Sequence, residues 1–170
     1  MHSHIHYQIV LPMKNRKSKH NKSNLRREWY EKFIVVIRQV HRRNLGNIVN
    51  RVLKRVDSTK YQMVSRSKKA GVECLVTVEQ LRQMLLAKYG TPCKYCNRVL
   101  VVKNFTFDHI VPLSKGGASN IENLQVICKT CNHMKGSLII EHFELLLDWL
   151  KTVPYELSRD IKIRLSRGIH

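Results

Sequence analysis

Residues 93–137 read CKYCNRVLVVKNFTFDHIVPLSKGGASNIENLQVICKTCNHMKGS, and this stretch decides how the chain folds. A Cys-x2-Cys pair stands near each end, Cys93 with Cys96 and Cys128 with Cys131. The two-residue gap lets each pair chelate a metal ion from one tight turn, and four thiolates complete the tetrahedral coordination of zinc. Such a site has no open coordination position and is structural, so we predict that a Zn2+ ion holds this region together. Four reduced cysteines without metal, or a redox pair, are the alternatives.

Polar residues suited to catalysis lie between the two cysteine pairs. Asp108 and His109 are adjacent where an apolar run ends, so their side chains diverge if the run is a strand. A neutral imidazole can take a proton from water near pH 7, and carboxylate or amide oxygens suit a hard divalent cation. An Asn amide or a backbone carbonyl could hold the other ring nitrogen. An Asp-His pair by itself also fits a structural role.

The segments CKYC, DHIVPLSKGG, ENLQVIC and CKTCNHMKG follow one another in an order and at a spacing that resemble the HNH endonucleases. The resemblance covers residues 93–137. It implies an α+β fold with a ββα-metal HNH core, and hydrolysis of a phosphodiester by in-line attack of water that leaves 5′-phosphate and 3′-hydroxyl ends.

The resemblance also implies a role for each residue of the motif. His109 would be the general base that activates the attacking water, and Asp108 would bind a catalytic divalent metal, Mg2+ or Mn2+. Asn123 would be the middle Asn of the motif, holding the loop and the orientation of His109. Asn132 stands where the family has its last His or Asn, and it would be the second ligand of the catalytic metal.

The end of the motif departs from the literal pattern, because His133 comes one position after Asn132. Adjacent residues of a helix differ by about 100° in direction, so the two cannot easily share one role. The spacing favours Asn132 as the ligand. His133 then contacts phosphate or solvent, and Lys135 contacts the DNA backbone or is a solvated lysine.

The charge of the chain is unusually positive and unevenly distributed. The formal net charge is +19, and residues 1–70 hold 18 of the 31 Lys and Arg but only three of the 12 acidic residues. Such a domain is expected to bind a polyanion, and we predict double-stranded DNA as the partner. A solvated basic surface is the alternative. The basic half of the sequence is separate from the half that holds the predicted site.

The pattern of apolar and basic residues divides the chain into four segments. Residues 1–24 form a basic flexible arm, residues 25–71 a helical basic DNA-binding region, residues 72–153 the HNH nuclease domain, and residues 154–170 a C-terminal helical tail. Within the second segment, helical patterns over 25–40 and 45–56 predict a hairpin, followed by a third basic helix over 58–70.

The sequence also predicts elements within the nuclease domain. Residues 73–76 form a short strand, and Thr77 with Gln80 forms a capping box that starts a helix. Residues 99–103 and 105–108 are predicted to be the two strands of a hairpin around Asn104. A short helix follows the second cysteine pair, and Ser137 caps the next helix.

No secretory signal and no apolar stretch long enough to span a bilayer is visible, so we expect an intracellular, soluble protein without a membrane partner. In that reducing setting paired cysteines favour metal over disulfides, and Cys74 is left over as a small apolar residue. We therefore predict a metal-dependent DNA endonuclease of a homing or phage type. One active site per chain fits nicking by a monomer or a double cut by a homodimer. The alternative is a non-catalytic zinc-stabilised module that binds nucleic acid.

Overall fold

The structure is a computed structural model and describes residues 19–41 and 44–167. Its elements follow in this order: α1 (Lys19–Val40), α2 (Leu45–Ala70), α3 (Val78–Lys88), β1 (Phe105–His109), η1 (Leu113–Lys115), β2 (Leu124–Cys128), α4 (Lys129–Lys135), α5 (Ile140–Thr152) and α6 (Tyr155–Ser166).

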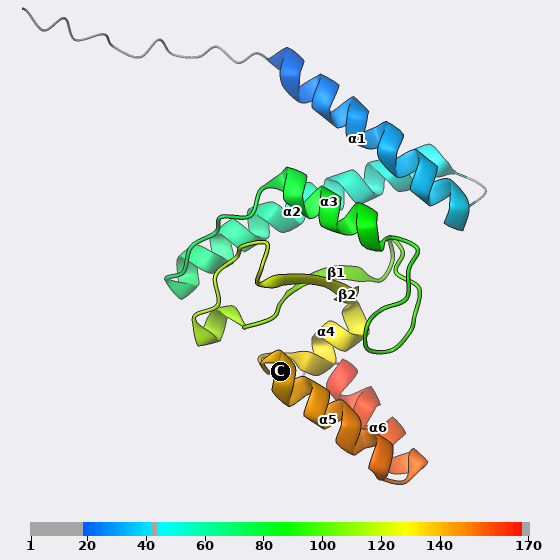
Figure 1. The fold of residues 1–170 in the computed structure, drawn as a ribbon, viewed down its shortest axis with the longest axis vertical. Helices are drawn as coiled ribbons and strands as arrows, with labels where there is room; N and C mark the ends of the chain where they lie inside the picture. The colour runs from blue at the N-terminus through cyan, green and yellow to red at the C-terminus, as the bar shows by residue number, and fades with distance from the viewer. Residues whose placement is uncertain (1–18, 42–43, 168–170) are drawn as a thin grey trace, which may run out of the picture.

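The centre of the molecule is a ββα unit (Figure 1). Strands β1 and β2 pair antiparallel, with Phe105 opposite Cys128 and His109 opposite Leu124. Helix α4 follows β2 without a loop, and Cys128 is its N-cap residue. The predicted α+β fold with a ββα core is confirmed.

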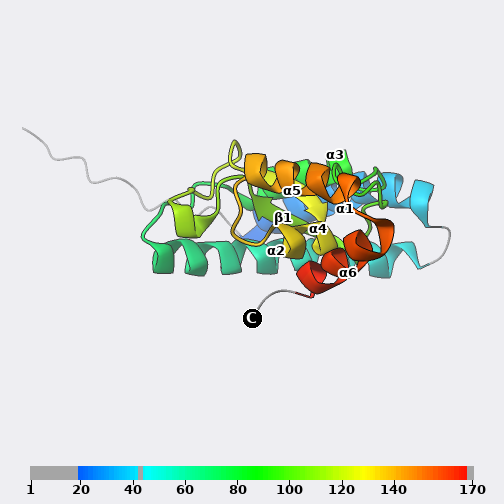
Figure 2. The ribbon, with the colours of Figure 1, turned by 90° about the horizontal axis from the view of Figure 1, so that it is seen from below.

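Helices α1, α2 and α3 cover one side of this unit, and α5 and α6 form a hairpin at the other end (Figure 1). All of them contribute to one hydrophobic core, whose fully buried residues include Phe33, Val49, Leu85, Phe105 and Phe143. An ionic contact also joins the first three helices, because Asp57 of α2 accepts from Arg26 of α1 and from Arg82 of α3. Figure 2 shows α2 running along one face of the molecule.

The helices of the basic region differ from the prediction in number and extent. Residues 45–70 form one continuous helix of 26 residues rather than two, because the buried stripe continues without a break from Val49 through Val56 to Met63. Gly71 then ends it in the left-handed conformation. Helix α1 begins at Lys19 rather than Leu25, so residues 19–24 of the predicted arm are helical. Residues 1–18 of that arm lie outside the described residues.

The predicted hairpin over 99–108 is wrong. Residues 99–103 make only a single bridge, between Val99 and Pro92, because Asn104 folds this segment into a turn. Its Oδ1 accepts from the Val101 amide and its Nδ2 donates to the Val99 carbonyl. The partner of β1 is instead β2, which starts 15 residues after β1 ends.

Of the predictions for local structure, one is confirmed and two are wrong. The capping box of Thr77 and Gln80 is confirmed, with both of its hydrogen bonds present. Residues 73–76 form no strand but a single bridge from Cys74 to Ser119. Ser137 is not a cap, because α5 begins after Ile139, which makes no side-chain cap hydrogen bond. Among the described residues, no helix is long and apolar enough to cross a membrane.

Candidate metal centre and active site

The four paired cysteines come together in space. Their sulfur atoms all lie within 4.8 Å of one another, and Sγ of Cys96 is 3.5 Å from Sγ of Cys128. Tetrahedral zinc with Zn–S bonds of about 2.3 Å needs sulfurs roughly 3.8 Å apart, so the cluster fits a structural zinc ion. The chain provides this geometry from three places: the turn at residues 93–96, the end of β2 and the first turn of α4.

Without a cation at their centre, two of these thiols are disfavoured as thiolates. Burial, and then the neighbouring sulfur of Cys128, raises the pKa of the Cys131 thiol far above its ordinary value. Burial likewise raises the pKa of Cys128, whereas at Cys93 backbone hydrogen bonds outweigh burial and lower the pKa. Thiolates that are this costly in isolation are stabilised by the divalent metal that they ligate.

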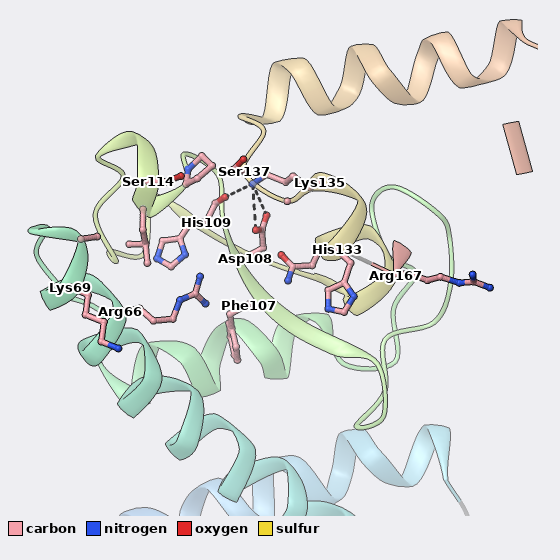
Figure 3. Close-up of a pocket in the computed structure, with 15 residues that line it drawn as sticks. Arg66, Lys69, Phe107, Asp108, His109, Ser114, His133, Lys135, Ser137 and Arg167 are labelled. Carbon is pink, nitrogen blue, oxygen red and sulfur yellow. Dashed lines mark hydrogen bonds and ion pairs between the residues drawn. The ribbon is translucent and has the colours of Figure 1, made fainter. Parts of the chain in front are cut away.

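A separate cavity of about 730 Å³ lies beside the ββα unit. Figure 3 shows it between the end of β1, the helix α4 and the C-terminal turns of α2. Asp108, His109, Asn132, His133 and Lys135 all line it, so the structure brings together five of the six non-cysteine residues that the sequence singled out. Asn123 is the exception.

His109 is the last residue of β1 and is 7% exposed. Its Nε2 lies 2.7 Å from Oγ of Ser119, so the partner of this nitrogen is a serine hydroxyl, not an Asn amide or a backbone carbonyl. Among the described residues Nδ1 has no hydrogen-bond partner, and it is the ring nitrogen left for the cavity. Burial, together with the charges of Arg66 and Lys135, lowers the pKa of His109 to about 4. The imidazole is therefore neutral at physiological pH.

The carboxylate of Asp108 is held by one side chain from β2 and one from α4. Gln125, its cross-strand neighbour, donates to Asp108 Oδ2 at 2.9 Å, and Nζ of Lys135 lies 3.3 Å from the same oxygen. Burial raises the pKa of Asp108, and the hydrogen bond from Gln125 and the charge of Lys135 oppose that shift. The carboxylate thus lines the cavity with cationic and amide donors behind it.

Lys135 differs from the prediction of a surface contact with DNA. Its side chain is completely buried, and its ammonium donates to the backbone carbonyl of His109 at 2.7 Å. Figure 3 shows these contacts as dashed lines. A lysine this enclosed fastens α4 to the end of β1 and positions the carboxylate of Asp108.

Asn123 organises the loop between β1 and β2. Its Oδ1 accepts from the Val111 amide, and its Nδ2 donates to the carbonyls of Val111 and Ala118. The loop closes so tightly that a Cβ on Gly117 would lie 1.9 Å from the Val111 carbonyl oxygen. Asn123 makes no direct hydrogen bond to His109, so any influence on that ring passes through the loop and Ser119.

Asn132 and His133 both line the cavity from α4, but in different settings. Asn132 also borders a second cavity of about 320 Å³, which it shares with Arg66, Phe107 and His109. His133 is exposed, and its Nδ1 donates to the Ser166 carbonyl at the end of α6. Oxygen ligands from Asp108 and Asn132 at one cavity fit a hard divalent cation that keeps several of its waters.

Four residues around this site were missed by the sequence analysis. Gln125 and Ser119 support Asp108 and His109, and Ser67 of α2 contacts Ser119 at 2.8 Å. Arg66, also from α2, lines both cavities, and Figure 3 shows its guanidinium between His109 and Phe107. The basic half is thus not separate from the site. Gln125 could have been found from the strand pairing, which places it opposite Asp108. No local sequence pattern indicates that the other three residues contact the site.

Comparison with known proteins agrees with this geometry. Residues 93–138 match the HNH endonuclease family. A stretch of 57 residues is 35% identical to the CRISPR-associated endonuclease Cas9 of Corynebacterium diphtheriae. That alignment covers 33% of this chain but only 5% of the Cas9 protein, so the likeness is confined to one region. The four-cysteine cluster, the ββα unit and the match over residues 93–138 together identify this part of the chain as an HNH endonuclease domain.

Proposed function

We propose that this chain is a metal-dependent endonuclease that hydrolyses phosphodiester bonds of double-stranded DNA. The observation that carries the proposal is the placement of His109. Its Nε2 is held inside the protein by Ser119, while its Nδ1 is left for a cavity bordered by a carboxylate, an amide and an arginine.

In this proposal Nδ1 of His109 takes the proton of the water that attacks phosphorus. Arg66 binds a non-bridging oxygen of the same phosphate from the opposite wall. Asp108 and Asn132 hold the divalent cation, Mg2+ or Mn2+, which when bound would stabilise charge on the leaving oxygen. The negative charge of the bound phosphate offsets that of Arg66 and raises the pKa of His109 from about 4 toward the working range of a general base.

The exposed face of α2 supports DNA as the partner. The polar side chains Asn47, Arg51 and Lys54 follow one another at steps of four and three residues. After an interval of 12 residues, Arg66 and Lys69 continue the same face three residues apart. The N-terminal part of this face borders a cavity of about 750 Å³, and its C-terminal part borders the active-site cavity. The one acidic residue of the helix, Asp57, is engaged by Arg26 and Arg82. We call these five residues, Asn47, Arg51, Lys54, Arg66 and Lys69, the α2 track.

The biological setting belongs to the same proposal. An HNH domain with a basic N-terminal region fits a homing or phage-encoded type, in which the four segments of the chain keep the roles predicted from the sequence. A single such site among the described residues fits nicking by a monomer, or a double cut by two copies.

Cleavage of supercoiled plasmid tests the proposal. We expect conversion to nicked or linear DNA with Mg2+ or Mn2+, none with EDTA, and no comparable cleavage of RNA of similar length. Sequencing of the products should find 5′-phosphate ends. DNA binding without cleavage under any of these metal conditions would instead support a non-catalytic zinc module.

A further inference from the structure

The N-terminal turns of α2 carry a cluster of exposed amide side chains. Asn44, Asn47 and Asn50 follow one another at steps of three residues. Arg51 and Lys54 lie four residues after the second and the third of them, so all five side chains share one face of the helix. The same five residues line the cavity of about 750 Å³ at this end of α2, and none of them is acidic.

The fold gives these amides no task within the chain. Asn44 is the N-cap residue of α2, but its side chain makes no cap hydrogen bond. In the part of the chain that the structure describes, the side chains of Asn47 and Asn50 are exposed and have no hydrogen bond or ion pair. Asn is also a poorer helix former than Lys, Gln or Glu, so these residues do not stabilise the helix that carries them.

An amide recognises a different part of DNA than a cationic side chain does. A phosphate offers acceptors only, whereas an adenine presents one acceptor and one donor in the major groove, and a single Asn amide can pair with both. The flanking Arg51 and Lys54 can supply the phosphate contacts that hold such a helix in register. We propose that Asn47 and Asn50 read adenine bases in the major groove, and this proposal rests on the function proposed above.

The dimensions of α2 agree with this role. An α-helix with its side chains is about 10–12 Å wide, and the major groove is about 12 Å wide. Helix α2 lies along one face of the molecule (Figure 2) and is continuous over 26 residues. The interval from Asn47 to Arg66, which lines the active-site cavity, is 19 residues, or about 28 Å along the helix.

This length limits where the recognised bases can lie. Successive base pairs are about 3.4 Å apart along the duplex. An interval of about 28 Å therefore corresponds to no more than about eight base pairs, and to fewer if the helix is inclined to the duplex axis. The inference thus predicts both the base that is read and its greatest distance from the bond that is cut.

Asn47→Ala combined with Asn50→Ala tests the inference. Both positions are exposed and Ala is the better helix former, so the double variant should melt no lower than the wild type. Asn44 stays unchanged because its φ is 59°, in the left-handed region that Ala rarely adopts. Gln83→Ala is the matched control, since it removes an exposed amide from α3 instead.

The readout is the position of many cuts in DNA of high sequence complexity, cleaved with Mg2+ and sequenced at the ends. Alignment of the ends at the cut gives the base composition at each flanking position. In the wild type and in Gln83→Ala, adenine should be preferred about tenfold over other bases within about eight base pairs on one side of the cut. The double variant should cleave without that preference. A flat composition in the wild type, or the same adenine preference in the double variant, overturns the inference.

Binding selection separates this inference from the proposed function. The full chain, without added Mg2+, is used to retain duplexes from a pool with randomised sequence. The wild type should enrich adenine-containing sites, and the double variant should not. Enrichment by a wild-type protein that cleaves no DNA would refute only the proposed function. Cleavage with a base preference that is indifferent to the two Ala substitutions would refute only the reading of bases by α2.

Discussion

At His109, burial has two opposite effects on the proposed role as a general base. A buried, uncharged imidazole can accept a proton, but the same burial makes the charged form costly. Asp108 beside it shows the complementary arrangement, since its carboxylate is buried against Gln125 and Lys135, which compensate its charge. Neither residue reaches this state through its own neighbours in sequence, because Ser119, Gln125 and Lys135 come from other elements.

The pKa of His109 makes the stability of the fold depend on pH. The folded-state pKa of His109 is lowered from 6.5 to about 4. Between these two pH values the imidazole is protonated in the unfolded chain but neutral in the folded chain. Above pH 7 this effect vanishes. As the pH falls toward 4 stability is lost, by about 2 kcal/mol at pH 5.

Urea unfolding of wild type and His109→Gln at pH 7.5 and pH 5 measures this contribution. Between pH 7.5 and pH 5, the free energy of unfolding should fall by about 2 kcal/mol more in the wild type than in the variant. The variant lacks the titrating ring and shares every other group. An equal loss in the two proteins would show that His109 titrates near its ordinary pKa.

At the scale of elements, the cysteine pairs explain why β1, β2 and α4 form one unit. A two-stranded sheet of five-residue strands is marginal on its own, and here its second strand leads into the cluster through Cys128. Because the pairs lie at the two ends of the motif, their convergence brings the strand carrying His109 against the helix carrying Asn132. The four-cysteine cluster therefore also shapes the cavity that Asp108, His109 and Asn132 line.

Replacing one cysteine of the four-cysteine cluster should release zinc and unfold the central region. Cys131→Ser removes a buried ligand from a site whose metal contributes on the order of 10 kcal/mol to folding in zinc-finger peptides. Zinc content per chain and thermal melting followed by circular dichroism give the measurement. Cys74→Ser is the control, since Cys74 lies outside the cluster and contacts Lys60. A Cys131→Ser protein with wild-type melting would contradict a structural role for the metal.

The sequence predicted local features of these elements better than their pairing. The capping box at Thr77 follows from short-range chemistry, and the clustering of the two Cys-x2-Cys pairs follows from the coordination preference of zinc. Both are confirmed. The partner of β1 could not be found in this way, because residues 99–103 are as apolar as a strand and only the side chain of Asn104 turns them aside. The continuity of α2 was missed because the polar residues Asp57 and Ser58 resemble a break, although the buried stripe runs past them.

At the scale of the whole molecule, the α1–α3 layer does more than carry charge. Phe33, Ile37 and Val49 belong to the same core as β1 and β2, and Arg66 and Ser67 reach the active site. Removing residues 1–70 would expose that core, so deletion cannot isolate DNA binding from folding. Surface substitutions on the α2 track can.

Neutralising the α2 track should weaken DNA binding and flatten its dependence on salt. Each phosphate contact contributes about 0.9 to the slope of log K against log salt, so Arg51→Ala with Lys54→Ala should lower the slope by about two. Both residues are exposed and distant in sequence from the catalytic motif. Fluorescence anisotropy over a range of salt concentrations gives the slope.

Lys151→Ala with Lys162→Ala is the matched control, because it removes the same charge from the exposed surface of α5 and α6. The control should keep the wild-type slope. Equal slopes in both double variants and the wild type would show that DNA lies elsewhere than on α2.

The most direct test of the central claim compares two histidines that border the same cavity. Single-turnover cleavage of plasmid with Mg2+ should be about 10²-fold or more slower in His109→Ala than in the wild type, with DNA affinity unchanged by anisotropy. His133 lies on α4 and its imidazole is exposed. The His133→Ala variant should cleave DNA at close to the wild-type rate. Wild-type cleavage by His109→Ala, or an equal loss in His133→Ala, would contradict the assignment of His109 as the general base.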